Sequence, residues 1–196
     1  MKIALVVVLV ALLALGGCGV AAYNGLVGGE EKVEAQWSKL HSEYQRRADL
    51  VPQLVATVQG AADFEKSTLT ELTEARASVG KLEAKLPEDP AELERYMQAQ
   101  EKLSGALSRL LVVAENYPDL RATEAFRDLQ VQLEGTENRI GAARGDYIRA
   151  VQDFNVSIRR FPGSLVAGLT GFEKRPQLEA PEGSTERPKV EFDFQK

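Results

Sequence analysis

The chain has 196 residues, with a single Cys, a single His and a formal net charge of −5. One Cys excludes an internal disulfide and any metal site built on several cysteines, and one His excludes a metal site built on several histidines. The acidic balance argues against a nucleic-acid partner. Charge is unevenly spread, because residues 3–29 contain no charged side chain while the rest of the chain is rich in Asp, Glu, Lys and Arg.

The uncharged segment predicts a membrane anchor within residues 1–29. Ile3–Leu15 is continuously apolar, and a milder apolar stretch follows as far as Ala22. A terminal helix that is apolar on every face has no stripe with which to pack in a soluble core. A helix over residues 3–22 would be about 30 Å long, which is enough to cross the hydrocarbon core as a signal anchor.

A lipoprotein signal is the alternative form of this anchor. Leu15-Gly16-Gly17-Cys18 resembles a lipobox, in which small residues precede the Cys that receives the lipid. Cys18 is therefore a lipidation candidate, and acyl chains there would anchor the protein without a spanning helix. Either anchor keeps Lys2 on the cytoplasmic side and places residues 30–196 outside the cytoplasm, at the cell membrane or envelope.

Residues 30–161 predict an all-α domain, because their apolar side chains recur at steps of three and four. Pro52 predicts a kink in the first helix, and Gly60 predicts a break after it, although a continuous helix to Leu86 is the alternative. Asp89 before Pro90 predicts the start of a later helix. The predicted helices cover about residues 30–60, 64–86, 90–117 and 123–161.

Short links between long amphipathic helices favour an antiparallel four-helix bundle. The regular spacing of the last helix also suits a coiled coil of two or more chains, so a homo-oligomer is a second possibility. Residues 162–196 predict a largely disordered tail, with a short apolar group at Leu165, Val166, Leu169 and Phe172 that could pack on the end of the bundle.

No catalytic, cofactor-binding or metal-binding constellation is recognisable, and His41 is expected on an exposed helix face. The polar residues that stand out lie on or beside apolar stripes, where a buried charge needs a partner. Arg47 lies on the stripe of the first helix. We expect it either to pair with Glu137 or Glu115 across the bundle, which would fix the register of the helices, or to extend along the edge of the core. Arg144 flanks the stripe of the last helix.

Several segments, in the same order along the chain, carry a resemblance to the bacterial LemA family. Some residues depart from the usual family pattern, among them Gln53 and Asp146-Tyr147-Ile148. The matching segments are Tyr23–Val27, Trp37, Tyr44–Pro52, Leu54-Val55, Glu115–Leu120, Gly135–Ile140, Phe154-Asn155, Arg160–Pro162 and Gly171-Phe172.

The resemblance implies an N-terminally anchored, outward-facing helical domain of the four-helix bundle type, and it carries over no catalytic residues. The expected protein is therefore not an enzyme and needs no cofactor. We expect a membrane-tethered module that contacts lipid through its N-terminus and binds or scaffolds envelope proteins. The alternative is a self-associating coiled-coil protein that braces or remodels the membrane.

Overall fold

The computed structural model describes residues 2–60 and 64–178. Within these ranges the chain is all helical and contains no strand, as predicted. There are six helices rather than the four expected. They are α1 (Lys2–Gln59), α2 (Lys66–Val79), α3 (Pro90–Ala114), α4 (Pro118–Ala122), α5 (Glu124–Arg159) and α6 (Gly163–Thr170).

The two additional helices lie where a short link and a tail were predicted. Pro118 begins α4 at the first helical position, where the missing N–H of proline costs nothing. The helix lasts five residues, after which Thr123 starts α5 by accepting a hydrogen bond from the backbone N–H of Phe126 at 3.3 Å. The second additional helix, α6, follows the end of α5 directly.

The predicted anchor and the predicted first helix form one element. α1 continues for 58 residues without interruption, through the glycines that precede and follow Cys18 and also through Pro52. It ends at Gln59, and α2 starts at Lys66, so the helix break predicted at Gly60 is confirmed. Asp63, which directly precedes the predicted second helix and could cap it, lies outside the described residues.

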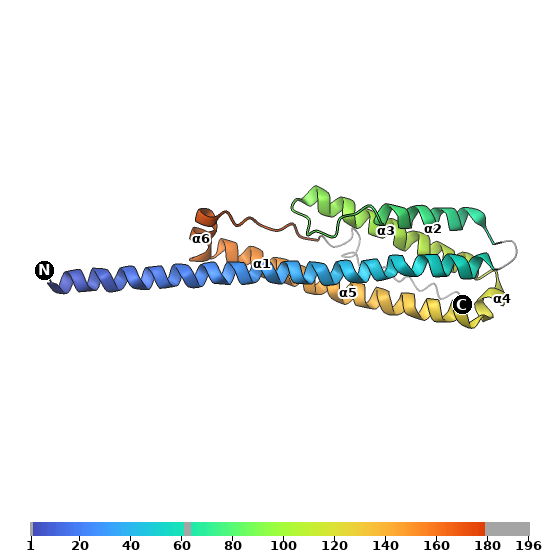
Figure 1. Cartoon of the computed structure of the whole chain (residues 1–196), viewed down its shortest axis with the longest axis horizontal. Helices are drawn as coiled ribbons and strands as arrows, with labels where there is room; N and C mark the ends of the chain where they lie inside the picture. The colour runs from blue at the N-terminus through green and yellow to red at the C-terminus, as the bar shows by residue number, and fades with distance from the viewer. Residues whose placement is uncertain (1, 61–63, 179–196) are drawn as a thin grey trace, which may run out of the picture.

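The long helices lie side by side, and the first part of α1 projects from them alone (Figure 1). α5 runs along α1 in the opposite direction, and α2 and α3 form a hairpin beside this pair. α6 packs against both α1 and α5 at the end of the body from which α1 projects.

Local capping explains where α3 begins. The Asp89 side chain accepts a hydrogen bond from the backbone N–H of Glu92 at 2.8 Å, and the Glu92 carboxylate accepts one from the backbone N–H of Glu88 at 3.0 Å. Pro90 occupies the first turn, as the sequence predicted. Two otherwise unpaired donors at the start of the helix are thereby satisfied.

The core consists of two apolar clusters at successive levels along the body. Trp37, Tyr96 and Phe154 belong to the cluster nearer the projecting end of α1, and Leu54 and Leu103 belong to the cluster farther from it. On α1 the first cluster extends to Tyr44 and the second begins at Ala48. The buried Arg47 therefore lies at the boundary between the two.

The folded domain continues past residue 161 into the segment predicted to be a largely disordered tail, and part of the apolar group in that segment packs on the end of the bundle, as the sequence suggested. Val166 and Ala167 of α6 are buried, and so is Leu178. The segment after α6 is held by Asn155 of α5. The Asn155 side chain donates to the backbone carbonyl of Arg175 at 2.8 Å and accepts from the backbone N–H of Arg175 at 2.9 Å. The remainder of the predicted tail, residues 179–196, lies outside the described residues.

Candidate functional site

The projecting part of α1 is an apolar rod, which we define as residues 3–22, and at its inner end Ala22 packs against the first apolar cluster of the core. Large apolar side chains along the rod, such as Leu5, Leu13 and Val20, are exposed. In the part of the chain that the structure describes, α1 is the one helix long and apolar enough to cross a membrane. The thiol of Cys18 is free and exposed on the rod. This geometry is compatible with either predicted anchor.

Arg47 is the centre of a polar layer inside the body. Its side chain is 3 % exposed, and its Nη1 donates to Oε1 of Glu137 at 2.7 Å. Its Nη2 lies 2.9 Å from both the backbone carbonyl and the side-chain oxygen of Gln100. The guanidinium also lies 5.3 Å from the centre of the Tyr44 ring, within the range of a cation–π interaction.

The layer joins three helices at one level of the body. Arg47 belongs to α1, Gln100 to α3 and Glu137 to α5. The neighbouring Thr136 is buried, and its hydroxyl accepts a hydrogen bond from Arg139 at 2.8 Å. Arg139 continues to the surface of α1, where it pairs with Glu43 at 2.9 Å.

The structure brings together two of the four polar residues singled out from the sequence. Arg47 contacts Glu137 and does not lie along the edge of the core. Glu115, the other proposed partner, is exposed at the C-terminal end of α3. Arg144 is partly buried near Tyr44, where its charge opposes the effect of burial on the pKa of that phenol.

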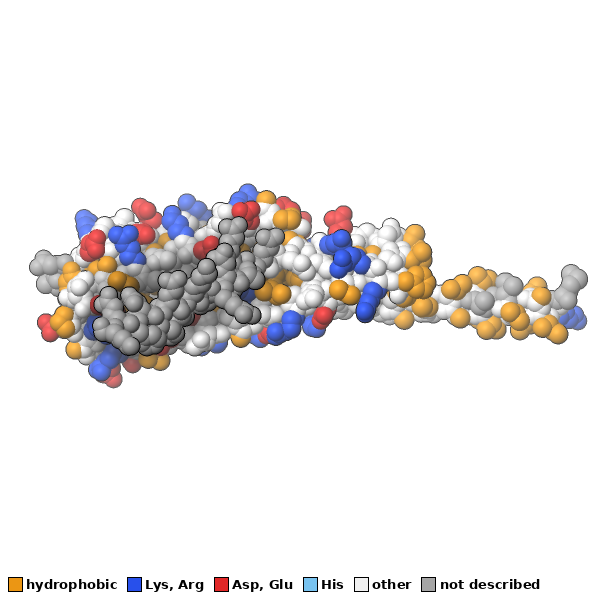
Figure 2. Space-filling view, turned by 180° about the vertical axis from the view of Figure 1, so that it is seen from behind, with side chains coloured by type: hydrophobic (Ala, Val, Ile, Leu, Met, Phe, Trp, Pro, Cys, Tyr) orange, Lys and Arg blue, Asp and Glu red, His pale blue; other side chains and the backbone are white. Residues whose placement is uncertain are grey.

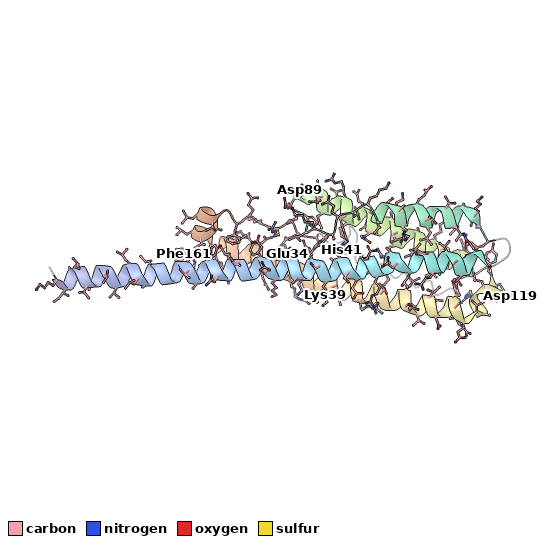
Figure 3. The ribbon with its side chains drawn as sticks, in the orientation of Figure 1. Glu34, Lys39, His41, Asp89, Asp119 and Phe161 are labelled. Atoms are coloured by element: carbon pink, nitrogen blue, oxygen red, sulfur yellow. The ribbon has the colours of Figure 1, made fainter. Side chains whose placement is uncertain are left out.

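His41 lies beside this layer, in an aromatic cluster. It is partly buried rather than exposed as predicted, and its Nδ1 is hydrogen-bonded to the Tyr96 hydroxyl at 2.8 Å. Trp37 packs edge-on against Tyr96 with 4.8 Å between ring centres, and its indole N–H donates to the carbonyl of Ala84 at 3.0 Å. His41 is marked in Figure 3, on the part of α1 that lies within the body.

Burial shifts the titration of this cluster toward its neutral forms. It lowers the pKa of His41, and it raises the pKa of Tyr44 and Tyr96. Burial also raises the pKa of Tyr147, whose ring packs at a tilt against Trp37 with 5.4 Å between ring centres, to about 12. At neutral pH the cluster is therefore an uncharged, hydrogen-bonded part of the core.

The polar layer has the properties of a structural device that fixes how the helices align. Both terminal nitrogens of Arg47 donate hydrogen bonds, and of its three nitrogens only the Nε has no partner among the described residues. A shift of α1 along α3 or α5 would bury this charge without its partners, at a cost of several kcal/mol. The described residues also contain no group of three or more His, Cys, Asp or Glu that could hold a metal ion.

Two contacts of buried polar side chains were not predicted from the sequence: that of Arg47 with Gln100 and that of Asn155 with Arg175. Gln100 occupies an apolar position of the α3 stripe, and a polar residue at such a position is the one local signal of a buried partner for Arg47. The contact between Asn155 and Arg175 has no comparable signal. The periodicity of α5 places Asn155 beside the core, but it does not show whether the Asn155 side chain binds a distant segment of the chain.

Comparisons with known proteins show a family match and several similar proteins. Residues 36–192 match the model of the LemA family. Magnetosome protein MamQ 2 of Paramagnetospirillum magneticum is 28 % identical over 182 residues, covering 83 % of this chain and 67 % of the relative. Magnetosome protein MamQ of Magnetospirillum gryphiswaldense is 26 % identical with the same coverage. Protein LemA of Metamycoplasma hominis is 24 % identical over 144 residues, covering 74 % of this chain and 63 % of the relative.

Proposed function

We propose a function on the premise that the chain belongs to the LemA family. The protein is anchored by the rod of α1, which contacts membrane lipid, and its body stands outside the cytoplasm as an antiparallel four-helix bundle of α1, α2, α3 and α5. The observation that carries the proposal is the continuity of α1. One unbroken helix contains the exposed apolar rod and also contributes buried side chains to the core of the body. Such a helix would hold the body at a fixed distance from the bilayer.

A spanning helix is the form of anchor that we favour. The rod contains no charged residue between Ile3 and Ala22, and its length of about 30 Å matches the hydrocarbon core of a bilayer. The helix also continues through Gly16, Gly17 and Cys18, so these residues do not separate the rod from the body. With Lys2 retained in the cytoplasm, this anchor directs the body outward.

We assign the body a non-enzymatic role in binding or scaffolding other envelope proteins. The end of the body opposite the rod supports this role, because it contains an open hollow of about 650 Å³ that is lined in part by Asp119. The hollow is lined in part by Asn116–Leu120, a segment that also carries the family resemblance. Asp119 and Phe161, labelled in Figure 3, mark the far end and the rod end of the body.

Self-association through a coiled coil of α5 is the less favoured alternative. The stripe that would form such a seam is already covered within the chain, since Phe126, Ile140 and Phe154 are buried. α5 packs along α1 and also contacts α4 and α6. A coiled coil between copies would require this packing to open.

Photo-crosslinking in intact cells tests the proposed role. A photoreactive residue is placed at Asp119, and the matched control carries it at Lys102 on an exposed position of α3. We expect one defined envelope protein to crosslink at position 119 and not at position 102, and to return this chain in the reciprocal experiment. A second copy of the chain at position 119 would favour self-association, and a monomer without partners in its native membrane would contradict the proposal.

A further inference from the structure

Beside the base of the rod lies a second exposed apolar surface, contributed mainly by the C-terminal part of the domain. Phe161 is 80 % exposed, and Leu165 and Leu169 of α6 are 62 % and 81 % exposed. Tyr23, the first residue after the rod, is also exposed. We call these four side chains the collar. Figure 2 shows hydrophobic side chains gathered in a band at the end of the body where the rod begins.

α6 is built to present this surface rather than to hide it. Val166 and Ala167 face the core, whereas Leu165 and Leu169, four residues apart, share the opposite side of the helix. The helix is fixed in this orientation at its start, because Gly163 is buried so tightly that a Cβ there would lie 2.3 Å from the carbonyl oxygen of Ser157. Exposure of Leu165 and Leu169 therefore follows from how α6 is docked.

The collar lies at the depth where a bilayer surface would be. The rod accounts for about 30 Å of hydrocarbon, so the next residue, Tyr23, falls at the membrane–water interface. The Tyr23 ring contacts Phe172, just beyond α6, with 5.9 Å between ring centres. The collar is thus continuous with the rod, and aromatic residues are favoured at this depth because their rings tolerate the headgroup region.

Charge beside the collar suits an anionic headgroup layer. Arg159 and Arg160 directly precede Phe161, and both are exposed. Among the described residues, neither is paired with a carboxylate. Apolar side chains with arginines beside them are the pattern of helices that lie in the plane of a membrane surface.

We propose that the collar inserts into the outer interfacial layer of the bilayer, with Arg159 and Arg160 on anionic lipid headgroups, so that the body is seated on the membrane and not suspended above it. This inference rests on the proposed function, because the rod must hold the collar at the surface. The seat adds a second contact beside α1 and restricts tilting of the body.

Site-specific fluorescence in vesicles tests the proposal on the full-length chain. Cys18→Ser removes the native thiol, and single cysteines replace Leu165, Leu169, Leu13 in the rod, or Val131 as the control. Val131 is 68 % exposed on α5, so it matches the collar residues in exposure and chemistry but lies outside the collar. Each variant carries an environment-sensitive label and is reconstituted with lipids that bear a quencher near the headgroup.

We expect labels at residues 165 and 169 to be quenched at least twofold more than the label at 131, and more strongly in vesicles with anionic lipid than in neutral ones. Arg159→Gln combined with Arg160→Gln should remove that dependence on lipid charge. Equal quenching at 165, 169 and 131 while the label at 13 is deep in the bilayer would overturn the collar and leave the anchor intact. A label at 13 that is not in the bilayer would overturn the anchor itself.

The same samples test the alternative that a second copy of the chain covers the collar. If copies cover the collar, the labels at 165 and 169 would be shielded from lipid-borne quenchers, and their shielding would increase with protein concentration. That result would also overturn the proposal. Circular dichroism of each labelled variant checks that the helices are retained.

Discussion

Arg47 of α1 and Glu137 of α5 form an ion pair of 2.7 Å at the level where the two apolar clusters of the core meet. The arginine is almost fully buried, whereas the Glu137 side chain is 46 % exposed. The two partners therefore contribute unequally. Loss of the arginine leaves buried polar groups without their partner, whereas loss of the Glu137 carboxylate leaves a position that water can reach.

The first prediction concerns the size of these two losses. Arg47→Ala should lower the free energy of unfolding by about 3–5 kcal/mol, because it also leaves Gln100 without its partner in the core. Glu137→Gln should cost only about 1–2 kcal/mol, since an amide or water can still accept from Arg47. Denaturant unfolding of the full chain in detergent measures the free energy of unfolding of both variants. Equal losses in the two variants would contradict the unequal contributions of Arg47 and Glu137.

Arg47→Met tests whether the layer also fixes the register of the helices. Methionine fills similar space without a charge, so the buried cluster would no longer select one alignment of α1 against α3 and α5. We expect looser packing or an altered assembly state, seen by NMR and sedimentation. A variant with a raised melting temperature and unchanged fold and assembly would show that register does not depend on Arg47.

The second prediction uses two glycines of α6 as a matched pair. Gly163→Ala should destabilise the docking of α6 by about 1–3 kcal/mol, because its Cβ would collide with the Ser157 carbonyl. Gly168→Ala meets no atom within 4 Å and should be neutral or stabilise the helix by up to about 1 kcal/mol. Hydrogen exchange over residues 163–178 distinguishes them, and unchanged protection in Gly163→Ala would contradict the close approach.

The third prediction is a dependence of stability on pH through His41. Burial lowers its pKa in the folded state below the 6.5 of an unfolded histidine, so the folded protein takes up the proton less readily. The stability that depends on neutral His41 is complete above pH 6.5 and is lost as the pH falls through the folded pKa. His41→Gln should remove this component, and identical stability profiles for the variant and the wild type below pH 6.5 would contradict it.

The sequence predicted the parts of the fold that depend on neighbouring residues. Capping of α3 by Asp89 and the break after Gln59 are local, and the stripe that contains Arg47 is visible as a period of three to four. The apolar group of residues 165–172 indicated that this segment could pack on the bundle, but not which of its side chains would be buried. The bond between His41 and Tyr96 joins residues far apart in the chain, so no local pattern indicates it. Glu137 could be proposed as a partner of Arg47, but only the packing of α1 on α5 distinguishes it from Glu115.

The fourth prediction separates the two forms of anchor. Intact-mass spectrometry of the protein extracted from its native membrane should give the full-length chain with an unmodified Cys18, as expected for a spanning helix. A chain that lacks residues 1–17 and carries acyl groups on Cys18 would instead identify a lipoprotein. The body would then still be tethered at the base of the rod, but the rod itself would be absent from the mature protein.

The central claim is that α1 crosses the membrane and holds the body outside the cytoplasm, and cysteine labelling in intact cells tests it most directly. In a Cys18→Ser background, Val131→Cys reports on the body and Leu13→Cys on the rod. A membrane-impermeant maleimide should label position 131 in intact cells and leave position 13 unlabelled until the membrane is dissolved. Labelling of position 131 only after the cells are lysed would place the body in the cytoplasm and contradict the account.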